Sequence, residues 1–450
     1  MRILLALETL SLSGWGASLE SPSTCDICHF HPGRVVDVHR IASRRAQVKK
    51  MSLVRFGRRL SSASARRGFA TMFNIDAGLS AEETEFQKIA LDFAAKEIAP
   101  HAAEWDEKKF FPKETLQKCA QLGFAGVFVD SEVGGSGLSR LEGSIIFEAL
   151  ATGCPATSAY LTIHNMCLWM IDQFGSDEQR KSLLPGLCSM DQFISYCLTE
   201  PGSGSDAQSL STSAKRQGDS IILNGTKAFI SGGGSSDFYL VMAREETDQI
   251  SCFLVPRDAP GVSFGAQERK LGWNCQPTCA VILEDAEIPA TNMVGPSGDG
   301  FKIAMQALDG GRVNIASCSL GGAQCALNHT LDHVRVRSQF GKTLSMYQNV
   351  QFKVADMSTQ LHAARLLVRD AARNLDQKTP NRSAVCAMAK RFATDAGFDI
   401  IDECLQLHGG YGYLKDYPIE KLLRDTRVHR ILEGTNEVMR MIIARKVLQE

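Results

Sequence analysis

Apolar residues recur with a helical period between residues 78 and 195, and several of these runs start at a recognisable cap. Ser80-x-x-Glu83 is a capping box ahead of an amphipathic run that stops at Pro100. Similar signals stand at Ser139 (with Glu142) and Ser176 (with Gln179), and Pro112 suits the first turn of a helix ending near Gly123. Residues 78–195 are therefore predicted to form a helical domain.

Short β-branched and aromatic runs, separated by Gly and Pro, replace this period over residues 196–298. The runs at 220–231, 238–243, 252–255 and 280–283 predict strands. Asn224-Gly225 predicts a tight hairpin turn that would divide the first of these runs into two strands. This segment is predicted to be a middle β domain.

Helical periodicity returns in longer segments over residues 299–450. They cover residues 301–337, 346–376, 382–407 and 436–448. Long helices with short links favour an antiparallel four-helix bundle. The order helices, strands, bundle lacks the βαβ alternation of the common nucleotide-binding folds and predicts a mostly helical α+β protein.

Charge is distributed unevenly along the chain. Residues 1–72 hold 12 Lys or Arg and 4 Asp or Glu, against 37 and 46 in the remainder. Such a basic head suits a nucleic-acid arm or a targeting segment. From Val38 to Ile75 there is no acidic residue, and the Arg- and Ser-rich stretch from Met51 has the composition of a mitochondrial transit peptide, with a cut predicted after Phe69. We interpret residues 1–72 as a targeting segment, with 1–50 as an upstream extension, and predict a protein of the mitochondrial matrix.

Cysteine usage and hydropathy exclude several classes of protein. The 14 cysteines lack framework spacing, which favours a reducing compartment. Cys25-x-x-Cys28 has no second ligand pair at zinc spacing, so no metal site is predicted. No apolar run approaches the roughly 20 residues that cross a bilayer. Neither a membrane span nor nucleic-acid binding is expected.

The densest motif is the loop from Cys197 to Asp206, in which Gly202-x-Gly204-x-x-Ala207 formally matches a dinucleotide fingerprint. The polar, strand-like residues that follow offer no helix N-terminus for a pyrophosphate, which argues against that interpretation. A tight turn needing Gly explains the residues equally well. The loop's backbone N–H groups and hydroxyls could instead hold the edge of a planar cofactor.

Three further motifs are ambiguous when taken singly. Arg337-x-x-Phe340-Gly341 could bind a pyrophosphate, although most surface arginines are solvated. The glycines of His408 to Tyr413 could end a helix or let the backbone approach a ligand. Thr435 or Asn436 could cap the last helix, but capping leaves Glu433 unexplained.

Together and in this order, the motifs resemble those of the acyl-CoA dehydrogenase family over residues 78–450. They are Tyr196–Asp206, Arg337–Gly341, Gln406–Gly412 and Leu432–Glu437. The segments His164–Cys167, Gly310–Ser317 and Gly409–Asp416 are similar to the branch that acts in valine breakdown. The resemblance implies a helical domain, a β-barrel-like middle domain and a C-terminal four-helix bundle, assembled as a homotetramer.

The resemblance also implies FAD as the cofactor and a set of residues around it. The flavin would be lined by Cys197, Leu198, Thr199, Gly202, Gly204, Ser205, Phe229, Ile230 and Ser231. A neighbouring subunit would supply Arg337, Phe340, Gln348, Gln406, Leu407, His408, Gly409 and Gly410 to the pyrophosphate and adenine. Thr435, Asn436 and Glu437 would also touch the cofactor, and Ser205, Asp309, Gly310, Gly311, Arg312 and Arg445 would contact the acyl-CoA.

The implied reaction is α,β-dehydrogenation of a short branched acyl-CoA, with isobutyryl-CoA giving methacrylyl-CoA. Glu433 would take the α-proton while the β-hydrogen passes as hydride to flavin N5, and electron-transfer flavoprotein would accept the electrons. Some family members place the base on an earlier helix, where this chain has Gly311. Isovaleryl-, 2-methylbutyryl- or butyryl-CoA as substrate, an acyl-CoA oxidase and a non-catalytic scaffold remain alternatives.

Overall fold

The structure, a computed structural model, describes residues 78–449. The predicted targeting segment (1–72), its transit-like stretch from Met51 and the Cys25–Cys28 pair lie outside the described residues.

The N-terminal part is helical, and its helices begin where the caps predict. The capping boxes at Ser80, Ser139 and Ser176 are all formed, with each Ser hydroxyl and the Glu or Gln three residues later accepting from the other's backbone N–H. The helices are α2 (Ala81–Phe93), extended by a π-helical turn (Ala94–Ile98), α3 (Ala102–Lys108), α4 (Lys113–Gln121), α5 (Arg140–Ala151), α6 (Pro155–Phe174) and α7 (Asp177–Cys188).

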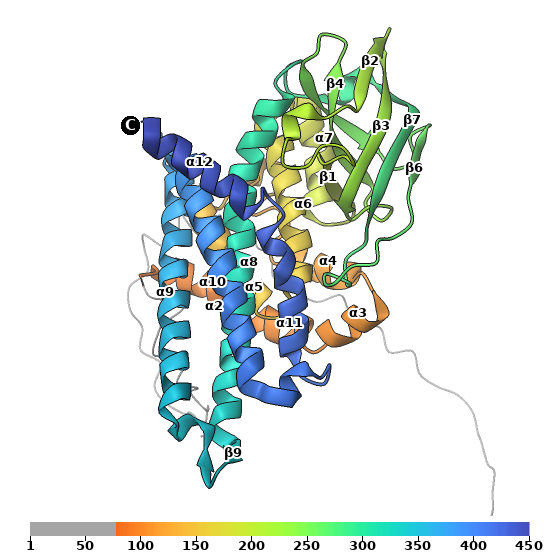
Figure 1. Cartoon of the computed structure of the whole chain (residues 1–450). Coiled ribbons are helices and arrows are strands. Elements are labelled where there is room, and N and C mark those ends of the chain that lie inside the picture. The colour runs from red at the N-terminus through yellow and green to blue at the C-terminus, as the bar shows by residue number, and fades with distance from the viewer. Residues whose placement is uncertain (1–77, 450) are drawn as a thin grey trace, which may run out of the picture.

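The middle part is an eight-stranded sheet, curved in Figure 1 beside the upper ends of α6 and α8. Its order is β6-β7-β3-β2-β4-β5-β8, and β1 pairs in parallel with β4. The strands are β1 (Ile194–Cys197), β2 (Ser213–Gln217), β3 (Ser220–Ser231), β4 (Phe238–Glu245), β5 (Ile250–Pro256), β6 (Val262–Phe264), β7 (Thr278–Pro289) and β8 (Met293–Val294).

The predicted hairpin turn at Asn224-Gly225 is wrong. β3 runs unbroken through both residues, and its register against β7 shifts between Leu223 and Gly225, as at a β-bulge. A Cβ on Gly225 would lie 2.6 Å from the Thr212 hydroxyl, so glycine is needed for close packing there. The turn lies earlier, at Gly218 (φ +61°), between β2 and β3.

The C-terminal part is a bundle in which the long helices lie side by side (Figure 1). It contains α8 (Gly300–Val336), α9 (Gln348–Asp376), α10 (Arg382–His408), α11 (Pro418–Arg427) and α12 (Asn436–Gln449). The short strands β9 (Ser338–Gln339) and β10 (Lys342–Thr343) project from its far end. Helix α11, which the sequence pattern did not predict, packs on α8 and α10, whereas α12 packs on α10.

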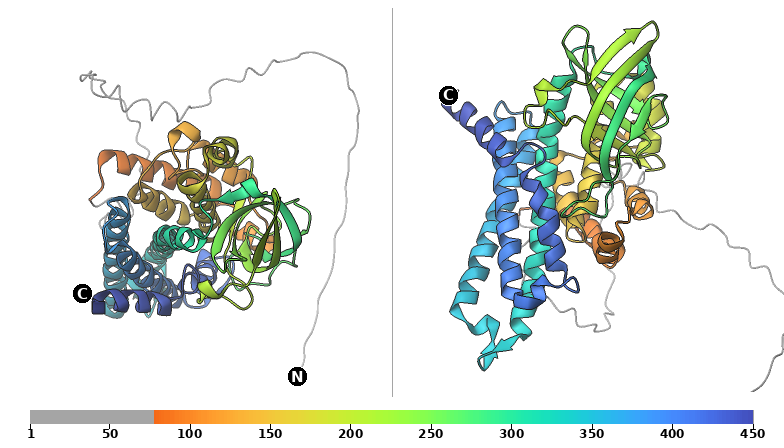
Figure 2. Two further views of the ribbon diagram at one scale, coloured as in Figure 1. Left: turned by 90° about the horizontal axis from the view of Figure 1, so that it is seen from above. Right: turned by 45° about the vertical axis from the view of Figure 1, so that its right-hand side comes forward.

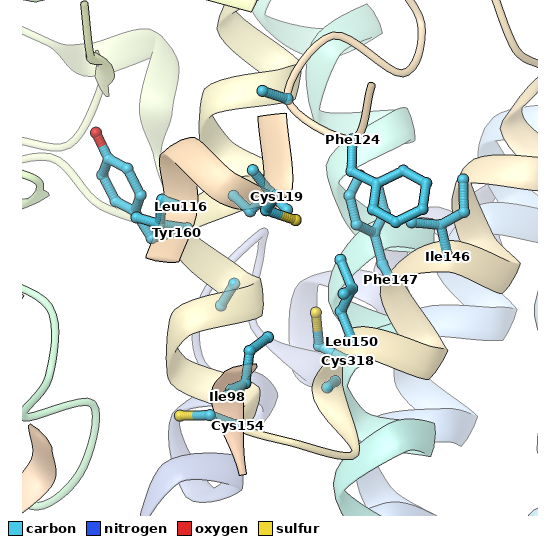
Figure 3. Packing of buried hydrophobic residues seen from close by; sticks show 14 of the residues in the cluster. Ile98, Leu116, Cys119, Phe124, Ile146, Phe147, Leu150, Cys154, Tyr160 and Cys318 are labelled. Carbon is cyan, nitrogen blue, oxygen red and sulfur yellow. The ribbon is translucent and has the colours of Figure 1, made fainter. Parts of the chain in front are cut away.

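Buried side chains join these parts into one body. Ile98, Leu116, Phe147, Tyr160 and their neighbours form the N-terminal core, and Cys318 reaches it from α8 (Figure 3). The two further views show the orange and yellow N-terminal helices packed beside both the sheet and the bundle (Figure 2). Arg365 of α9 donates to Glu148 of α5 at 2.7 Å, with both side chains buried.

The fold class is confirmed: helices, then a β domain, then a helical bundle. Within residues 78–449, every helix is too short or too polar to be a candidate for crossing a bilayer. The same residues contain no group of three or more His, Cys, Asp or Glu side chains that could hold a metal ion.

Candidate active site

Glu433 lies on a strained turn just before α12. Its φ is +56°, and Gly434 follows with φ +84°. A non-glycine residue in the left-handed region costs about 1 kcal/mol or more, and such strain is typical of functional positions. Thr435 explains the start of the helix, because its hydroxyl accepts from the Val438 N–H at 3.2 Å.

The Glu433 carboxylate faces bare helix backbone. A Cβ built on Gly311 of α8 would lie 2.3 Å from Glu433 Oε2, so the carboxylate fills the space that a side chain at 311 would need. Oε2 is enclosed and has no hydrogen-bond partner within the described structure. Burial raises the pKa of Glu433 to about 7, against the opposing charges of Arg312 and Lys390. The carboxyl can therefore act as a base near neutral pH.

Arg312 is held close to this turn by a carboxylate on its own helix. Its Nη1 donates to Asp309 Oδ1 at 2.5 Å, and the Ser383 hydroxyl of α10 donates to Asp309 Oδ2. Arg312 Nε also makes a long hydrogen bond, 3.5 Å, to the backbone carbonyl of Glu433. The predicted substrate contacts Asp309 to Arg312 and the predicted base therefore meet in one place.

Lys390 of α10 supports the same turn from the other side. Its side chain is fully buried, and Nζ donates to Gly434 O at 2.7 Å and to Asn436 Oδ1 at 2.8 Å. The Asn436 amide donates in turn to Thr394 and Asp395. Asn436 is thus buried within the protein, while Glu437 and Arg445 lie exposed on α12.

The loop after β1 is anchored by a buried ion pair. Lys227 Nζ donates to Glu200 Oε1 at 2.7 Å, and the backbone N–H groups and hydroxyls of Ser211 and Thr212 also donate to the Glu200 carboxylate. Burial alone would raise the pKa of Glu200, but these donors outweigh it and hold the pKa at about 2. Gly202 and Gly204 are exposed, with open space around both, so a flat ligand can approach their backbone.

We expect Glu200→Gln to lower the free energy of unfolding by about 3 kcal/mol, because Lys227 would remain as an uncompensated buried charge. Thermal unfolding measures this. The native pKa lies below the usual 4.5, so the stabilisation is present above pH 4.5 and is lost as the pH falls toward 2. Glu200→Gln/Lys227→Met should recover part of the loss; a double variant weaker than the single would contradict the ion-pair explanation.

Phe229 presents an aromatic face beside this loop. It has φ +58° at a second register shift of β3, between Lys227 and Ile230, and its side chain is 67% exposed. The neighbouring Ile230 is buried in the core of the sheet together with Cys197. The Ser195 hydroxyl donates to the backbone carbonyl of Ser231. An exposed ring on a strained strand is poor packing but a suitable wall for a planar ligand.

The residues predicted to bind the pyrophosphate and adenine lie at the far end of the bundle, near β9 (Figure 1). Arg337 and residues 406–410 are among the residues that line a cavity of about 590 Å³ there. His408 stacks on His333 with a ring separation of 4.4 Å. Phe340 (95% exposed) and Gln348 lie outside the lining of this cavity. One chain therefore does not bring this group to Glu433.

Sequence reasoning missed Glu200, Lys227, Ser383 and Lys390. A signal for Lys390 was present, because Cys386, Ala387, Ala393 and Thr394 share its helix face and are small enough to be buried. Ser383 and Lys227 carry no comparable signal, since their partners are 74 and 27 residues away.

Comparison with known proteins gives matches along the whole described chain. Sequence models of the acyl-CoA dehydrogenase N-terminal, middle and C-terminal domains match residues 80–191, 195–286 and 298–448. Mitochondrial isobutyryl-CoA dehydrogenase of Bos taurus is 56% identical over 400 residues, covering 88% of this chain and 96% of the relative. The protein of the same name in Dictyostelium discoideum is 55% identical over 388 residues, covering 84% and 93%.

A solved structure shows the same architecture. Butyryl-CoA dehydrogenase from Megasphaera elsdenii superposes with a TM-score of 0.80 at 36% identity, covering 82% of this chain and 99% of that chain.

Proposed function

Because this chain belongs to the acyl-CoA dehydrogenase family, we propose that it converts isobutyryl-CoA to methacrylyl-CoA, with Glu433 as the base. The observation that carries the proposal is the Glu433 carboxylate, whose enclosed Oε2 has no hydrogen-bond partner in the described structure and lies against Gly311. The substrate assignment rests on the two relatives of more than half identity, both called isobutyryl-CoA dehydrogenase.

The chain's own groups account for removal of the α-proton. A thioester α-proton is weakly acidic, so the base must be close, correctly oriented and able to hold a proton near neutral pH. Burial provides the last property by raising the pKa of Glu433 to about 7. As the family resemblance implies, the backbone N–H of Glu433 would meet the thioester oxygen as negative charge develops on it.

The residues at and beside the loop after β1 fit a flavin. The exposed ring of Phe229, the Ser231 position and the open glycines at 202 and 204 form a wall and a cradle of the right kind. FAD bound there would supply the acceptor for the β-hydrogen, which leaves as hydride to flavin N5. Cys197 to Thr199, Ser205 and Ile230 would contribute mainly backbone, and residues 435–437 would lie at its edge.

Acyl-CoA would enter between this wall and α8. Ser205, Asp309 to Arg312 and Arg445 would hold it, and the bound acyl group would exclude water from Glu433. Arg337, Phe340, Gln348 and residues 406–410 would hold the adenine end of a neighbouring copy's FAD, which requires a homotetramer or a similar assembly.

The proposal extends to location and electron transfer. Both named relatives are mitochondrial, which supports a matrix location for this chain. Electron-transfer flavoprotein would reoxidise the enzyme. The domain boundaries proposed from the sequence are 78–195, 196–298 and 299–450.

Anaerobic titration of the purified holoenzyme tests the substrate. Isobutyryl-CoA should bleach the flavin absorbance faster than isovaleryl-, 2-methylbutyryl- or butyryl-CoA. One methylene changes binding by about 1–3 kcal/mol, so rate ratios of roughly 10 to 200 are expected. A faster reaction with another acyl-CoA would reassign the substrate, and no bleaching by any of the four would favour a non-catalytic scaffold.

A further inference from the structure

Lys390 is a charged side chain buried next to the base, and the mechanism above does not use it. It is 0% exposed, and both of its hydrogen-bond acceptors are neutral: the Gly434 carbonyl and the Asn436 amide oxygen. Removing an ammonium group from water costs several kcal/mol, which two neutral acceptors compensate poorly. A neutral donor could make the same two bonds more cheaply, so the charge itself calls for an explanation.

The geometry offers one, because two cations hold consecutive carbonyls of the strained turn. Arg312 reaches the carbonyl of Glu433 at 3.5 Å, and Lys390 reaches that of Gly434 at 2.7 Å. Glu433 has φ +56°, which a non-glycine residue keeps only when contacts enforce it, whereas Gly434 adopts its positive φ without strain. Lys390 therefore fixes the Gly434–Thr435 peptide, one residue after Glu433, and Arg312 holds the peptide between Glu433 and Gly434.

The nearest acidic group on α10 has other partners. Asp395 forms ion pairs with Arg430 at 3.1 Å and with Arg440 at 3.4 Å. Within the described structure it forms no ion pair with Lys390. Among the carboxylates that act on Lys390, Glu433 has the largest effect, ahead of Asp395 and Glu437. Lys390 is thus bonded to the turn that carries the base, and Glu433 is the carboxylate that most opposes the loss of its charge.

We infer that Lys390 is a positioning residue whose ammonium both holds the 433–434 turn and stabilises the ionised form of Glu433. This inference rests on the proposed role of Glu433 as the base. The catalytic contact with substrate remains that of Glu433, and Lys390 acts through it.

The titration behaviour of the two groups agrees with this role. Burial lowers the pKa of Lys390 to about 8, and Glu433 opposes that shift. Burial raises the pKa of Glu433 to about 7. The pair carrying both charges is therefore most populated between about pH 7 and 8, and protonation of Glu433 removes it as the pH falls. The other titratable groups acting on the pair, or shifted by it, are Arg312 (α8), Cys167 (α6), Tyr196 (β1), His429 (before α12), Asp395 (α10) and Glu437 (α12).

Three substitutions separate charge from hydrogen bonding. Lys390→Arg keeps the charge, Lys390→Gln keeps a donor, and Lys390→Met keeps neither. Loss of one nearby positive charge should raise the pKa of Glu433 by about one unit. In Lys390→Gln, kcat/KM should then fall about fivefold at pH 7 and recover to near the parent value at pH 9, while Lys390→Arg keeps the parent pH profile below pH 8. Lys390→Met should show the same shift and a lower plateau.

A readout without turnover completes the test. The infrared carbonyl band of the protonated Glu433 carboxyl, identified by its loss in Glu433→Gln, should disappear at higher pH in Lys390→Gln than in the parent holoenzyme. Lys421→Gln is the matched control, because Lys421 is also buried and lies 2.6 Å from Asp425. Its loss should lower Tm but should not change the pH at which kcat/KM falls on the acid side.

The outcomes distinguish this inference from the proposed function. If Lys390→Gln lowers kcat/KM equally at every pH and leaves the infrared titration unmoved, Lys390 is merely structural and the inference fails. Glu433→Gln would still be inactive in that case. If Glu433→Gln keeps its activity, the proposed function fails first.

Discussion

Glu433→Gln should lower kcat by a factor of 100 or more, because general-base catalysis contributes about 10² to 10⁴ and the amide cannot accept the α-proton. The substitution is nearly isosteric, so bound FAD and the fold should be retained. Flavin reduction by isobutyryl-CoA under anaerobic conditions measures the effect. Glu178→Gln, an exposed carboxylate in the first turn of α7, is the control and should keep parent activity.

The same variant should be more stable than the parent at pH 8. The pKa of Glu433 is raised from 4.5 to about 7 in the native state, so the native state binds this proton more tightly than the unfolded state. Stability from this group is complete below pH 4.5 and is lost as the pH rises through 7. Gln removes that loss, and Tm at pH 8 should increase.

More than a few per cent of parent kcat in Glu433→Gln would reject Glu433 as the base.

A carboxylate placed on α8 by Gly311→Glu should restore activity to a Glu433→Gly enzyme, which lacks the carboxylate at residue 433. Gly311→Glu alone should be inactive and poorly folded, because its Cβ would lie 2.3 Å from Glu433 Oε2 and two carboxylates would compete for one space. Glu433→Gly frees that space and suits the φ of +56° at this position. The kcat of the double variant Gly311→Glu/Glu433→Gly should therefore exceed that of Glu433→Gly by about tenfold or more.

The control for this experiment fills the space without a carboxylate. Gly311→Ala/Glu433→Gly should fold like the double variant and stay inactive. Equal activity of the two double variants would show that the position of the carboxylate, as argued from Gly311, does not govern proton removal.

The sequence predicts local features of the fold well and close packing poorly. The capping boxes at Ser80, Ser139 and Ser176 depend on residues three apart, and all three form. Asn224-Gly225 carries the same short-range signal as a hairpin turn, yet the glycine serves the approach of Thr212. That contact comes from elsewhere in the sheet and is invisible in the local pattern.

Helix α11 shows a second limit. It spans Pro418–Arg427, and Pro418 in its first turn is the kind of signal that predicted the shorter α4 after Pro112, but no helix was predicted from it. Its buried face, with Ile419 and Leu422, becomes evident only against α8 and α10.

The candidate site divides along the same line. Glu433 could be singled out because its motif, and the glycine at 311, are both legible in the sequence. What could not be predicted is how its proton affinity is set, since burial and the charges of Arg312 and Lys390 come from helices more than 40 residues away in sequence. The small residues on the helix face of Lys390 indicate that it is buried, but they do not show that it contacts the turn after Glu433.

The distance between the Arg337 cavity and Glu433 has a consequence for damaged copies of the protein. In the proposed assembly, a chain with a substitution at Arg337 keeps its own base, but it binds the FAD of the neighbouring subunit less tightly. A chain altered at Glu433 impairs its own chemistry alone. In an assembly that mixes altered and unaltered chains, a substitution at Arg337 would therefore reduce the activity of the neighbouring subunit. A substitution at Glu433 would reduce only the activity of the subunit that carries it.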